Sequence, residues 1–325
     1  MDKSVHTKTR CKQKRTPLQQ DETIRRSHMK AQRFKKKMED NMATEFKSFY
    51  KTVGGGEGDK CYYPTRLDPY GRGCYFNCSY CYAKGLLDFR KLWNPEDVGV
   101  ADINKISGTI FKKIQPGDVV RLGGMTDCFQ PVEEQIKNTY KTIKLLNKRK
   151  VHYLIVTKST LVSTDEYLDI MNKDLAHIQI SIATDNEDVL AKTDNAGTFV
   201  ERKNTVETLY ENGFDVSLRL APFIFETSDF DVINQINVDK CLVEFMRVKP
   251  KMGEALGDII DLNNYSLKEG GYRHLPLETK IEQLEKLDFK EISVCDDVQE
   301  HYDYFTENFN FNKNDCCNLR LSEDQ

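Results

Sequence analysis

The stretch HIQISIAT, residues 177–184, alternates between apolar and polar side chains, and this alternation decides the fold that we expect. In an extended strand its three isoleucines share one face, whereas Gln179 and Ser181 share the other. The stretch DVSLRLA, residues 215–221, repeats the pattern and places Arg219 on the polar face. A strand covered by helices on both sides should be apolar on both faces. The polar faces therefore predict strands that line a lumen containing water or a ligand.

Further strand-like runs alternate with helical patterns along the chain. The expected strands are residues 119–122, 152–157, 178–183, 215–220 and 242–248. Residues 133–146, which follow Pro131, have helical periodicity. Residues 199–212 repeat it and end at Gly213, a typical residue after a helix. No dinucleotide-type glycine fingerprint follows the first strand. The expected fold is therefore α/β, a partial (β/α)6 barrel of the TIM type with parallel strands.

Composition divides the chain into three regions. Residues 1–58 are expected to form a basic, flexible N-terminal arm, in which residues 1–40 carry thirteen Lys/Arg against five Asp/Glu, and GGGEG at 54–58 marks a break. Residues 59–250 are expected to form the core barrel, and residues 251–325 an extension that closes it. The arm could hold the phosphates of DNA or RNA. The alternative is a solvated tail that has no partner.

The overall composition is that of a globular protein, with 39% hydrophobic and 30% charged residues in a chain of 325. No apolar run approaches the length of a membrane span, and the N-terminus lacks the apolar core of a signal peptide. We therefore expect a cytoplasmic protein with no membrane partner. In a reducing compartment, ten cysteines indicate metal ligation or chemistry in any tight cluster rather than disulfides.

The tightest cysteine cluster is CYFNCSYCYA, residues 74–83, which holds Cys74, Cys78 and Cys81. Thiolate clusters bind soft metals, and two kinds of site compete. A structural zinc site closes with four ligands, commonly from two CxxC-like pairs, and no second pair of that kind lies near the triplet. A four-iron cluster held by three cysteines keeps one iron open to a small molecule. The triplet therefore favours an iron–sulfur centre with a vacant position.

This spacing, with Tyr80 directly before the third cysteine, resembles the signature of the radical S-adenosylmethionine (radical SAM) enzymes. The wider stretch YPTRLDPYGRGCYFNCSYCYA, residues 63–83, resembles the branch related to spore photoproduct lyase. The resemblance covers roughly residues 60–250. It implies a [4Fe–4S] cluster on Cys74, Cys78 and Cys81 that binds S-adenosylmethionine and cleaves it reductively to a 5′-deoxyadenosyl radical. It also implies an electron donor such as flavodoxin or ferredoxin. Together with the basic arm, this branch suggests a nucleic acid base or a nucleotide as substrate, and a peptide or a small metabolite is the alternative.

The resemblance also suggests residues that contact S-adenosylmethionine. Gly123 and Gly124 follow a strand and are similar to the glycine pair that meets the methionyl amine, because glycine lets the backbone approach a ligand closely. Ser181 is similar in placement to the ribose contact. Arg219 could pair with the cofactor carboxylate in a bidentate bond, and Lys158 is a second candidate for that anion. For Ser181, Arg219 and Lys158 a purely structural hydrogen bond or ion pair is the alternative.

The chain departs from the spore photoproduct lyase pattern where a hydrogen-donating cysteine would stand. The sequence reads MTDCFQP there, so Met125 occupies that place and Cys128 lies three positions on. Cys128 is a candidate thiol donor, or else a loop cysteine near the mouth of the site. Tyr80 is the second catalytic candidate, with barrel-mouth packing as the alternative role. His177 is expected to be a polar core residue rather than a ligand.

Three cysteines near the C-terminus raise a separate hypothesis. Cys295 ends a short strand-like run, and Cys316 and Cys317 are adjacent. Together they could hold an auxiliary iron–sulfur cluster, whereas adjacent cysteines suit one tetrahedral ion poorly. The alternative is one buried cysteine and an exposed pair. For the whole chain, the alternative to an enzyme is a non-catalytic iron–sulfur or zinc protein with a nucleic-acid-binding arm.

Overall fold

A computed structural model describes residues 45–54, 56–94 and 97–321 of the chain. Most of the basic arm expected over residues 1–58 lies outside these residues. No helix in the described ranges is both long enough and apolar enough to cross a bilayer.

The described residues form an eight-stranded sheet in the order β1-β2-β3-β4-β5-β6-β7-β10. Strand β1 runs antiparallel to β2, and every other neighbouring pair in the sheet is parallel. The strands are β1 (Tyr50–Thr52), β2 (Thr65–Leu67), β3 (Val119–Leu122), β4 (His152–Thr157), β5 (Ala176–Ile182), β6 (Asp215–Phe223), β7 (Lys240–Phe245) and β10 (Glu291–Val294). No hydrogen-bonded pair of described strands joins β1 to β10. The strands therefore form a partial barrel, as the sequence predicted, and the strand β10 that residues 251–325 contribute extends the sheet at β7 without pairing with β1.

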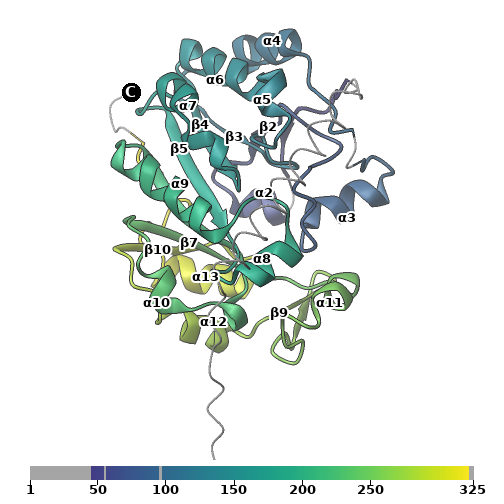
Figure 1. The fold of residues 1–325 in the computed structure, drawn as a ribbon, viewed down its shortest axis with the longest axis vertical. Helices are drawn as coiled ribbons and strands as arrows, with labels where there is room; N and C mark the ends of the chain where they lie inside the picture. Colours follow the sequence, from purple (N-terminus) through teal and green to yellow (C-terminus); the bar gives the residue numbers. More distant parts are fainter. Residues whose placement is uncertain (1–44, 55, 95–96, 322–325) are drawn as a thin grey trace, which may run out of the picture. The chain divides into compact units, whose positions relative to one another are not determined.

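Helices lie between the strands along the chain, and one follows the last strand. They are α2 (Gly56–Lys60), α3 (Tyr82–Phe89), α4 (Ile103–Lys113), α5 (Glu133–Ile136), α6 (Asn138–Arg149), α7 (Asp165–Ile170), α8 (Glu187–Thr193), α9 (Phe199–Glu211), α10 (Phe230–Ile233), α11 (Pro250–Leu256), α12 (Leu277–Leu284) and α13 (Gln299–Asn308). Two 3-10 turns, η1 (Thr160–Ser163) and η2 (Phe225–Thr227), follow β4 and β6, and β8 (Leu267–Glu269) and β9 (Tyr272–His274) form a separate hairpin. Figure 1 shows helices α4 to α7 beside β2 to β4, and α10, α12 and α13 beside β7 and β10.

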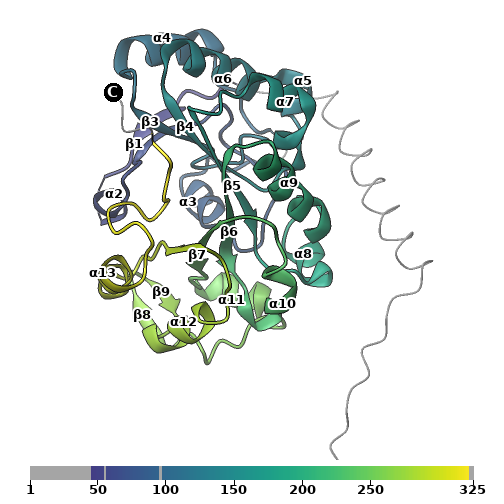
Figure 2. The ribbon, with the colours of Figure 1, turned by 90° about the vertical axis from the view of Figure 1, so that its left-hand side faces the viewer.

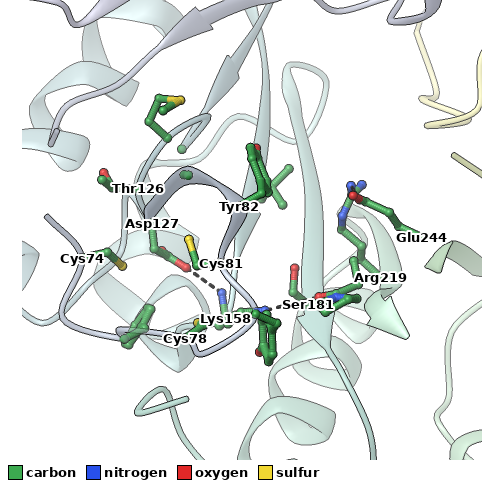
Figure 3. A pocket seen from close by; sticks show the side chains of 18 of the residues that line it. Cys74, Cys78, Cys81, Tyr82, Thr126, Asp127, Lys158, Ser181, Arg219 and Glu244 are labelled. Carbon is green, nitrogen blue, oxygen red and sulfur yellow. Dashed lines mark hydrogen bonds and ion pairs between the residues drawn. The ribbon is translucent and has the colours of Figure 1, made fainter. Parts of the chain in front are cut away.

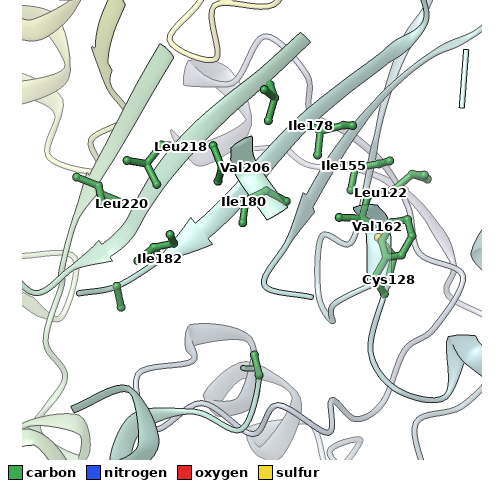
Figure 4. Packing of buried hydrophobic residues seen from close by; sticks show 14 of the residues in the cluster. Leu122, Cys128, Ile155, Val162, Ile178, Ile180, Ile182, Val206, Leu218 and Leu220 are labelled. Atoms are coloured by element: carbon green, nitrogen blue, oxygen red, sulfur yellow. The ribbon is translucent and has the colours of Figure 1, made fainter. Parts of the chain in front are cut away.

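The apolar and polar faces of the central strands separate as the alternation predicted. In β5 and β6 the isoleucines and leucines pack against the covering helices, where Ile180 lies near Val206 of α9 (Figure 4). On the opposite face, Ser181 pairs in register with Arg219. Both of these side chains line a pocket on the inner side of the sheet. The predicted lumen is thus present, and it carries the polar residues.

One predicted helix is interrupted. Residues 133–146 form two helices, because Lys137 adopts a left-handed conformation with φ 56° between α5 and α6. The buried Glu133 carboxylate accepts hydrogen bonds from the backbone N–H groups of Thr139 at 2.9 Å and Tyr140 at 2.8 Å. These two N–H groups belong to the first turn of α6 and lack partners within the helix. Glu133 therefore caps α6 from the preceding helix, and the helical periodicity alone did not reveal it.

A chain of polar residues joins the N-terminal ends of four strands. The Lys240 ammonium and His177 both bind the Asp215 carboxylate, each at 2.6 Å, and His177 Nε2 lies 3.1 Å from His152 Nδ1. All four side chains are buried or nearly so. The prediction that His177 is a satisfied polar core residue is therefore confirmed.

Candidate active site

The three cysteines of the triplet lie on one wall of the pocket at the inner side of the sheet (Figure 3). Cys74 and Cys78 are buried, each with 8% of its surface exposed, and Cys81 is partly exposed. Cys81 is the N-cap of α3, and its sulfur accepts a hydrogen bond from the Lys84 backbone at 3.4 Å. All three sulfurs can therefore face one ligand from a single loop.

Tight turns give the loop this shape. The Asn77 N–H bonds to the Cys74 carbonyl at 3.1 Å, and the Cys81 N–H bonds to the Cys78 carbonyl at 3.2 Å. Asn77 has φ 40°, in the left-handed region that asparagine tolerates better than most residues. The spacing of three and then two intervening residues thus corresponds to two consecutive turns.

Residues beyond the triplet fix the loop to the rest of the barrel. The Tyr80 hydroxyl donates to the Asp194 carboxylate at 2.6 Å, and the fully buried Arg202 forms an ion pair with the same carboxylate. Ser79 N–H donates to the Thr193 carbonyl at 2.8 Å. The sequence analysis missed Asp194 and Arg202. Asp194 directly follows α8 and Arg202 lies near the start of α9, and neither belongs to a recognisable motif.

Burial controls the ionisation of the free thiols. Burial raises the pKa of Cys74 to about 12, and the nearby Asp127 carboxylate raises it further. Burial also raises the pKa of Cys78 well above its ordinary value, although the Lys158 ammonium opposes the change. Without a metal, both groups are therefore neutral thiols at neutral pH. Thiolates form there only when a cation compensates their charge, which suits a metal site.

The glycine pair lies on the pocket wall formed by the end of β3. The pocket has a cavity volume of about 180 Å³, and Gly123 and Gly124 are among its lining residues. Gly123 has φ 82°, which favours glycine. A Cβ on Gly124 would lie 2.2 Å from Cδ of Arg66. The Asp68 carboxylate accepts the Gly124 N–H at 2.6 Å and fixes this turn. Asp68 was not predicted as a site residue.

Asp127 organises the end of β4 beside the triplet. Its carboxylate accepts hydrogen bonds from the Thr157 hydroxyl at 2.7 Å and from the Lys158 N–H at 2.8 Å. Burial raises the pKa of Asp127, and these hydrogen bonds oppose the increase. Asp127 lines the pocket but was not predicted from the sequence. Its position in the MTDCFQP segment, directly before Cys128, was the available signal.

The two predicted anion-binding cations differ in their surroundings. The Arg219 guanidinium donates to the Gln179 side-chain oxygen at 2.7 Å and forms an ion pair with Glu244. The Lys158 ammonium contacts the Ala221 carbonyl at 3.4 Å and lies 5.2 Å from the centre of the Tyr80 ring. Both line the pocket. Arg219 already holds a carboxylate of the protein, so Lys158 is the better placed of the two to meet a carboxylate from a ligand.

Aromatic and cationic side chains gather at the other side of the pocket. The Arg247 guanidinium lies 5.1 Å from the centre of the Tyr82 ring and 4.9 Å from that of Tyr272. The Lys249 ammonium lies 4.5 Å from the Tyr272 ring centre. The Tyr82 hydroxyl donates to the Gly124 carbonyl at 3.1 Å. Tyr82, Tyr272 and Arg247 line this side of the pocket, and Arg247 also forms an ion pair with Asp297.

Cys128 lies away from the pocket. It is 1% exposed and packs near Val162 in the apolar cluster on the helix side of the sheet (Figure 4). Among the described residues that line the pocket, the cysteines are those of the triplet. Met125 does line the pocket, at the place where a donor cysteine was expected. The geometry therefore offers no support for Cys128 as a hydrogen donor.

The C-terminal cysteines lie near one another. The carboxylate of Asp315 and the sulfurs of Cys316 and Cys317 are all within 4.8 Å of one another. Cys295 and Cys317 raise the pKa of the Cys316 thiol well above its ordinary value. Cys316 is buried and the other two are partly exposed. The alternative of one buried cysteine and an exposed pair therefore does not describe this arrangement.

The chain matches the Radical SAM superfamily over residues 69–233, just over half of its length. It therefore belongs to the radical SAM superfamily, whose members are enzymes that use a [4Fe–4S] cluster and S-adenosylmethionine. This membership sets aside the alternative of a non-catalytic cysteine protein. The matched range contains the triplet, the glycine pair, Lys158 and Ser181, as well as Arg219.

Individual proteins that are similar to this chain include mutants of spore photoproduct lyase. A tyrosine-to-phenylalanine mutant of spore photoproduct lyase has the same fold, with a TM-score of 0.57 at 14% identity over 78% of this chain and 80% of that chain. A double mutant of that lyase with bound AdoMet and dinucleoside spore photoproduct aligns with a TM-score of 0.55 at 14% identity, over 81% of this chain and 78% of that one. An uncharacterized protein of Methanocaldococcus jannaschii is 26% identical over 172 residues, which are 50% of this chain and 61% of the relative.

Proposed function

We propose that this enzyme binds a [4Fe–4S] cluster through Cys74, Cys78 and Cys81 and cleaves S-adenosylmethionine reductively in the pocket above them. The observation that carries the proposal is the presence of all three thiols on one wall of a pocket whose other walls hold the glycine pair, Lys158 and Ser181. Three protein ligands leave one iron open for a small molecule. A cluster held there would supply the single electron that breaks the bond between sulfur and C5′ of S-adenosylmethionine, which gives methionine and a 5′-deoxyadenosyl radical.

The residues around the triplet have separate tasks in this proposal. Gly123 and Gly124 bring backbone close to the methionyl group, because at both positions a Cβ would crowd neighbouring protein atoms and the turn at the pocket wall would have to change. Lys158 pairs with the cofactor carboxylate, since Arg219 is held by Glu244. Ser181 contacts the ribose. Tyr80 holds the cluster loop through Asp194 and contacts no reacting atom through its hydroxyl.

A nucleic acid base or a nucleotide is the proposed substrate class. The rings of Tyr82 and Tyr272 suit the flat face of a base, and the Lys249 ammonium, which lies over the Tyr272 ring, suits the charge of a phosphate. The shared fold with spore photoproduct lyase supports the same class. The pocket-lining residues that the structure describes include no cysteine outside the triplet. We therefore do not extend the proposal to the lyase's own repair reaction.

Two partners complete the proposal. A small electron donor such as flavodoxin or ferredoxin reduces the cluster. The basic residues 1–40 hold the phosphates of DNA or RNA. Deletion of these residues should weaken DNA or RNA binding roughly tenfold or more at low salt and flatten its salt dependence. Equal affinity of the full and truncated chains at every salt concentration would show that residues 1–40 are a tail without this role.

Anaerobic reconstitution tests the cleavage reaction. The protein is loaded with iron and sulfide, reduced with dithionite and supplied with S-adenosylmethionine. We expect 5′-deoxyadenosine from the natural chain and none from C74A/C78A/C81A. A Cys241→Ala variant is the matched control, because Cys241 is buried in β7 away from the triplet and should leave the reaction unchanged. Production of 5′-deoxyadenosine by the triple variant would refute the proposed cluster ligands.

Isotope transfer tests the substrate class. Deuterated nucleosides, nucleotides and short oligonucleotides are incubated with the reconstituted enzyme, and the 5′-deoxyadenosine is analysed by mass spectrometry. If 5′-deoxyadenosine contains deuterium from one of these compounds, the substrate is a nucleic acid base or a nucleotide. Transfer from a labelled peptide or small metabolite, with none from any nucleotide, would contradict the substrate proposal and leave the cleavage proposal intact.

A further inference from the structure

Exposed apolar side chains gather on helix α3 and on the residues that follow it. Three large hydrophobic side chains are exposed within residues 86–92: Leu86 with 37% of its surface exposed, Phe89 with 86% and Leu92 with 45%. The other exposed large hydrophobic side chains in the described ranges are each isolated in the sequence. A single exposed leucine is ordinary, whereas several apolar side chains in one short segment indicate a surface that meets a partner.

Helix α3 has a buried side and an exposed side. Ala83 and Leu87, which are one turn apart, are buried. Leu86 and Phe89 are three residues apart and therefore lie beside each other on the exposed side. Leu92 follows the turn that ends the helix, where its N–H donates to the Leu87 carbonyl at 2.8 Å. This bond keeps Leu92 close to the end of the helix. Figures 1 and 2 show α3 from two directions.

Basic side chains accompany the apolar ones. Arg90 and Lys91 are exposed and directly follow Phe89, and the Lys84 ammonium donates to the Asn77 side-chain oxygen at 3.1 Å. With Asp88 as their acidic residue, residues 82–92 carry a net charge of +2. Residues 41–325 together carry −11, since the whole chain has −3 and residues 1–40 carry +8. The segment is therefore a positive surface within a negatively charged part of the chain.

Helix α3 begins at the proposed cluster ligands. Cys81 is the N-cap of this helix, and Tyr82 in its first turn lines the pocket (Figure 3). At a rise of 1.5 Å per residue, Leu86 lies about 7.5 Å and Phe89 about 12 Å from Cys81 along the helix axis. Electron transfer between proteins requires such short separations, because its rate falls steeply with distance. A partner bound at Leu86 and Phe89 is therefore close to the proposed cluster.

The chemistry of this surface fits a small acidic redox protein of the flavodoxin or ferredoxin kind. Such carriers bear an excess of carboxylates near their redox centre, and complementary charge steers two proteins into contact. Leu86, Phe89 and Leu92 supply the apolar contact that a protein interface needs at its centre. A nucleic acid would use Arg90 and Lys91, but aliphatic side chains neither stack well on bases nor bind phosphates. The exposed leucines therefore favour a protein partner.

We propose that the exposed side chains of α3 and of residues 90–92, named here the α3 surface, dock the acidic electron carrier that reduces the cluster. This inference rests on the proposed function, in which each cleavage consumes a single electron. The reduced carrier loses that electron and the oxidised cluster gains it, and no atom crosses the contact. The α3 surface thus gives the carrier a place near the triplet.

Cleavage driven by two kinds of reductant tests the docking surface. The reconstituted full chain receives electrons from dithionite, or from flavodoxin or ferredoxin with an NADPH-dependent reductase, and 5′-deoxyadenosine is measured over time. At limiting carrier we expect Arg90→Glu/Lys91→Glu and Leu86→Ser/Phe89→Ser each to lower the carrier-driven rate roughly tenfold or more. The dithionite-driven rate should stay at that of the natural chain, because dithionite needs no docking surface.

The chain offers matched controls for both variants. Lys112→Glu/Lys113→Glu reverses an adjacent pair of exposed cations in the last turn of α4, and Phe311→Ser removes an exposed ring after α13. Both should keep the carrier-driven rate. As a readout without cleavage, binding of the chain to immobilised oxidised flavodoxin should weaken as the salt concentration rises, and Arg90→Glu/Lys91→Glu should flatten this dependence.

The outcomes separate this inference from the proposed function. Equal carrier-driven rates in the natural chain and both α3 variants would overturn the docking surface, and so would a natural chain that dithionite reduces but neither carrier does. Loss of the dithionite-driven rate in the variants would also overturn it, because α3 would then only support the cluster loop. If the variants instead lose affinity for a single-stranded oligonucleotide and keep the carrier-driven rate, the surface binds nucleic acid. Absence of dithionite-driven cleavage in the natural chain would refute the proposed function itself.

Discussion

The contacts of the Tyr80 hydroxyl indicate a positioning role rather than a catalytic one. Its ring lines the pocket, but its hydroxyl points to Asp194, which Arg202 holds from α9. Burial and the Asp194 charge raise the pKa of Tyr80 well above its ordinary value, so the hydroxyl stays protonated. A group held in this way serves as a hydrogen-bond donor within the protein. It is not placed to exchange a proton with a substrate.

We therefore predict that Tyr80→Phe lowers the free energy of unfolding by about 1–3 kcal/mol, because a buried carboxylate loses a donor. After reconstitution the variant should still form 5′-deoxyadenosine at close to the natural rate. Urea denaturation and the cleavage assay measure the two effects. Tyr153→Phe, which removes a buried hydroxyl in β4 outside the pocket, is the control. Loss of cleavage with unchanged stability and full iron content would instead assign Tyr80 a catalytic role.

The second prediction for a single residue concerns Lys158. Lys158→Ala should weaken S-adenosylmethionine binding roughly tenfold to hundredfold, because a partly buried charge-assisted bond is lost. Lys173→Ala is the matched control, since Lys173 is exposed and lies over Phe214. Equilibrium binding to the reconstituted protein is the measurement. If Lys158→Ala binds as the natural chain does and Arg219→Ala does not, the carboxylate contact belongs to Arg219.

The residues that support the site were harder to predict from the sequence than the cysteine triplet. The triplet was found because its spacing and its chemistry coincide in one short stretch. Asp68, Asp127 and Asp194 are single carboxylates that become recognisable only when the fold brings backbone N–H groups or Arg202 to them. No local pattern distinguishes them from solvated acidic residues. Their partners lie 56, 31 and 8 residues away in the chain.

At the level of elements, the turn after β3 depends on the absence of a side chain. We predict that Gly124→Ala weakens S-adenosylmethionine binding about tenfold and lowers the free energy of unfolding by about 1–3 kcal/mol, since the new Cβ would overlap the side chain of Arg66. Gly108→Ala in α4 is the control, because its Cβ would meet open space, and it should stabilise the helix by roughly 0.5–1 kcal/mol. Binding and denaturation curves test both. If Gly124→Ala and Gly108→Ala had the same affinity for S-adenosylmethionine and the same free energy of unfolding, this account of the turn would be wrong.

The N-terminal ends of the strands provide an acid-sensitive element. Burial raises the pKa of Asp215, but the His177 hydrogen bond and the Lys240 charge outweigh it and lower the pKa to about 2. A lowered pKa in the folded state adds stability that is present above the ordinary value of 3.8 and is lost as the pH falls towards 2. Asp215→Asn should therefore cost on the order of 2 kcal/mol at pH 7.

Denaturation at several pH values measures this contribution. The difference in stability between the natural chain and Asp215→Asn should shrink as the pH falls from about 4 to 2, because the natural carboxylate becomes protonated. Asp174→Asn is a control, since Asp174 is an exposed residue shortly before β5. A difference that does not change with pH would show that the lost contacts are not those of an ionised carboxylate.

The observed bounds of the helices and strands show which predictions from local sequence patterns were right and which were wrong. The strands expected at 119–122 and 152–157 have these bounds in the structure, because short β-branched runs flanked by turns leave little choice. The strand expected at 242–248 instead ends at Phe245, and β6 extends to Phe223. The helix expected at 133–146 breaks at Lys137 because Glu133 caps the following helix. Such a cap arises from tertiary packing and has no fixed spacing pattern.

For the whole molecule, the alternation in β5 and β6 was sufficient to predict an open α/β barrel with a polar interior. It could not predict that a C-terminal strand, β10, joins the sheet beside β7, because that pairing depends on contacts between distant segments. The contacts of Lys60 with Asp297 and Tyr302, and of Tyr63 with Asp315, have the same origin. Spacing in the sequence reveals a site that one loop carries, whereas contacts between distant segments appear only in the fold.

The central claim is that three cysteines hold a four-iron cluster with one iron open to S-adenosylmethionine. Mössbauer spectroscopy of the protein reconstituted with ⁵⁷Fe tests it most directly, with spectra recorded before and after addition of S-adenosylmethionine. We predict that the signal of a single iron in each cluster changes on addition and that C74A/C78A/C81A gives no cluster signal. A cluster whose irons all keep the same parameters when S-adenosylmethionine is present would contradict the account.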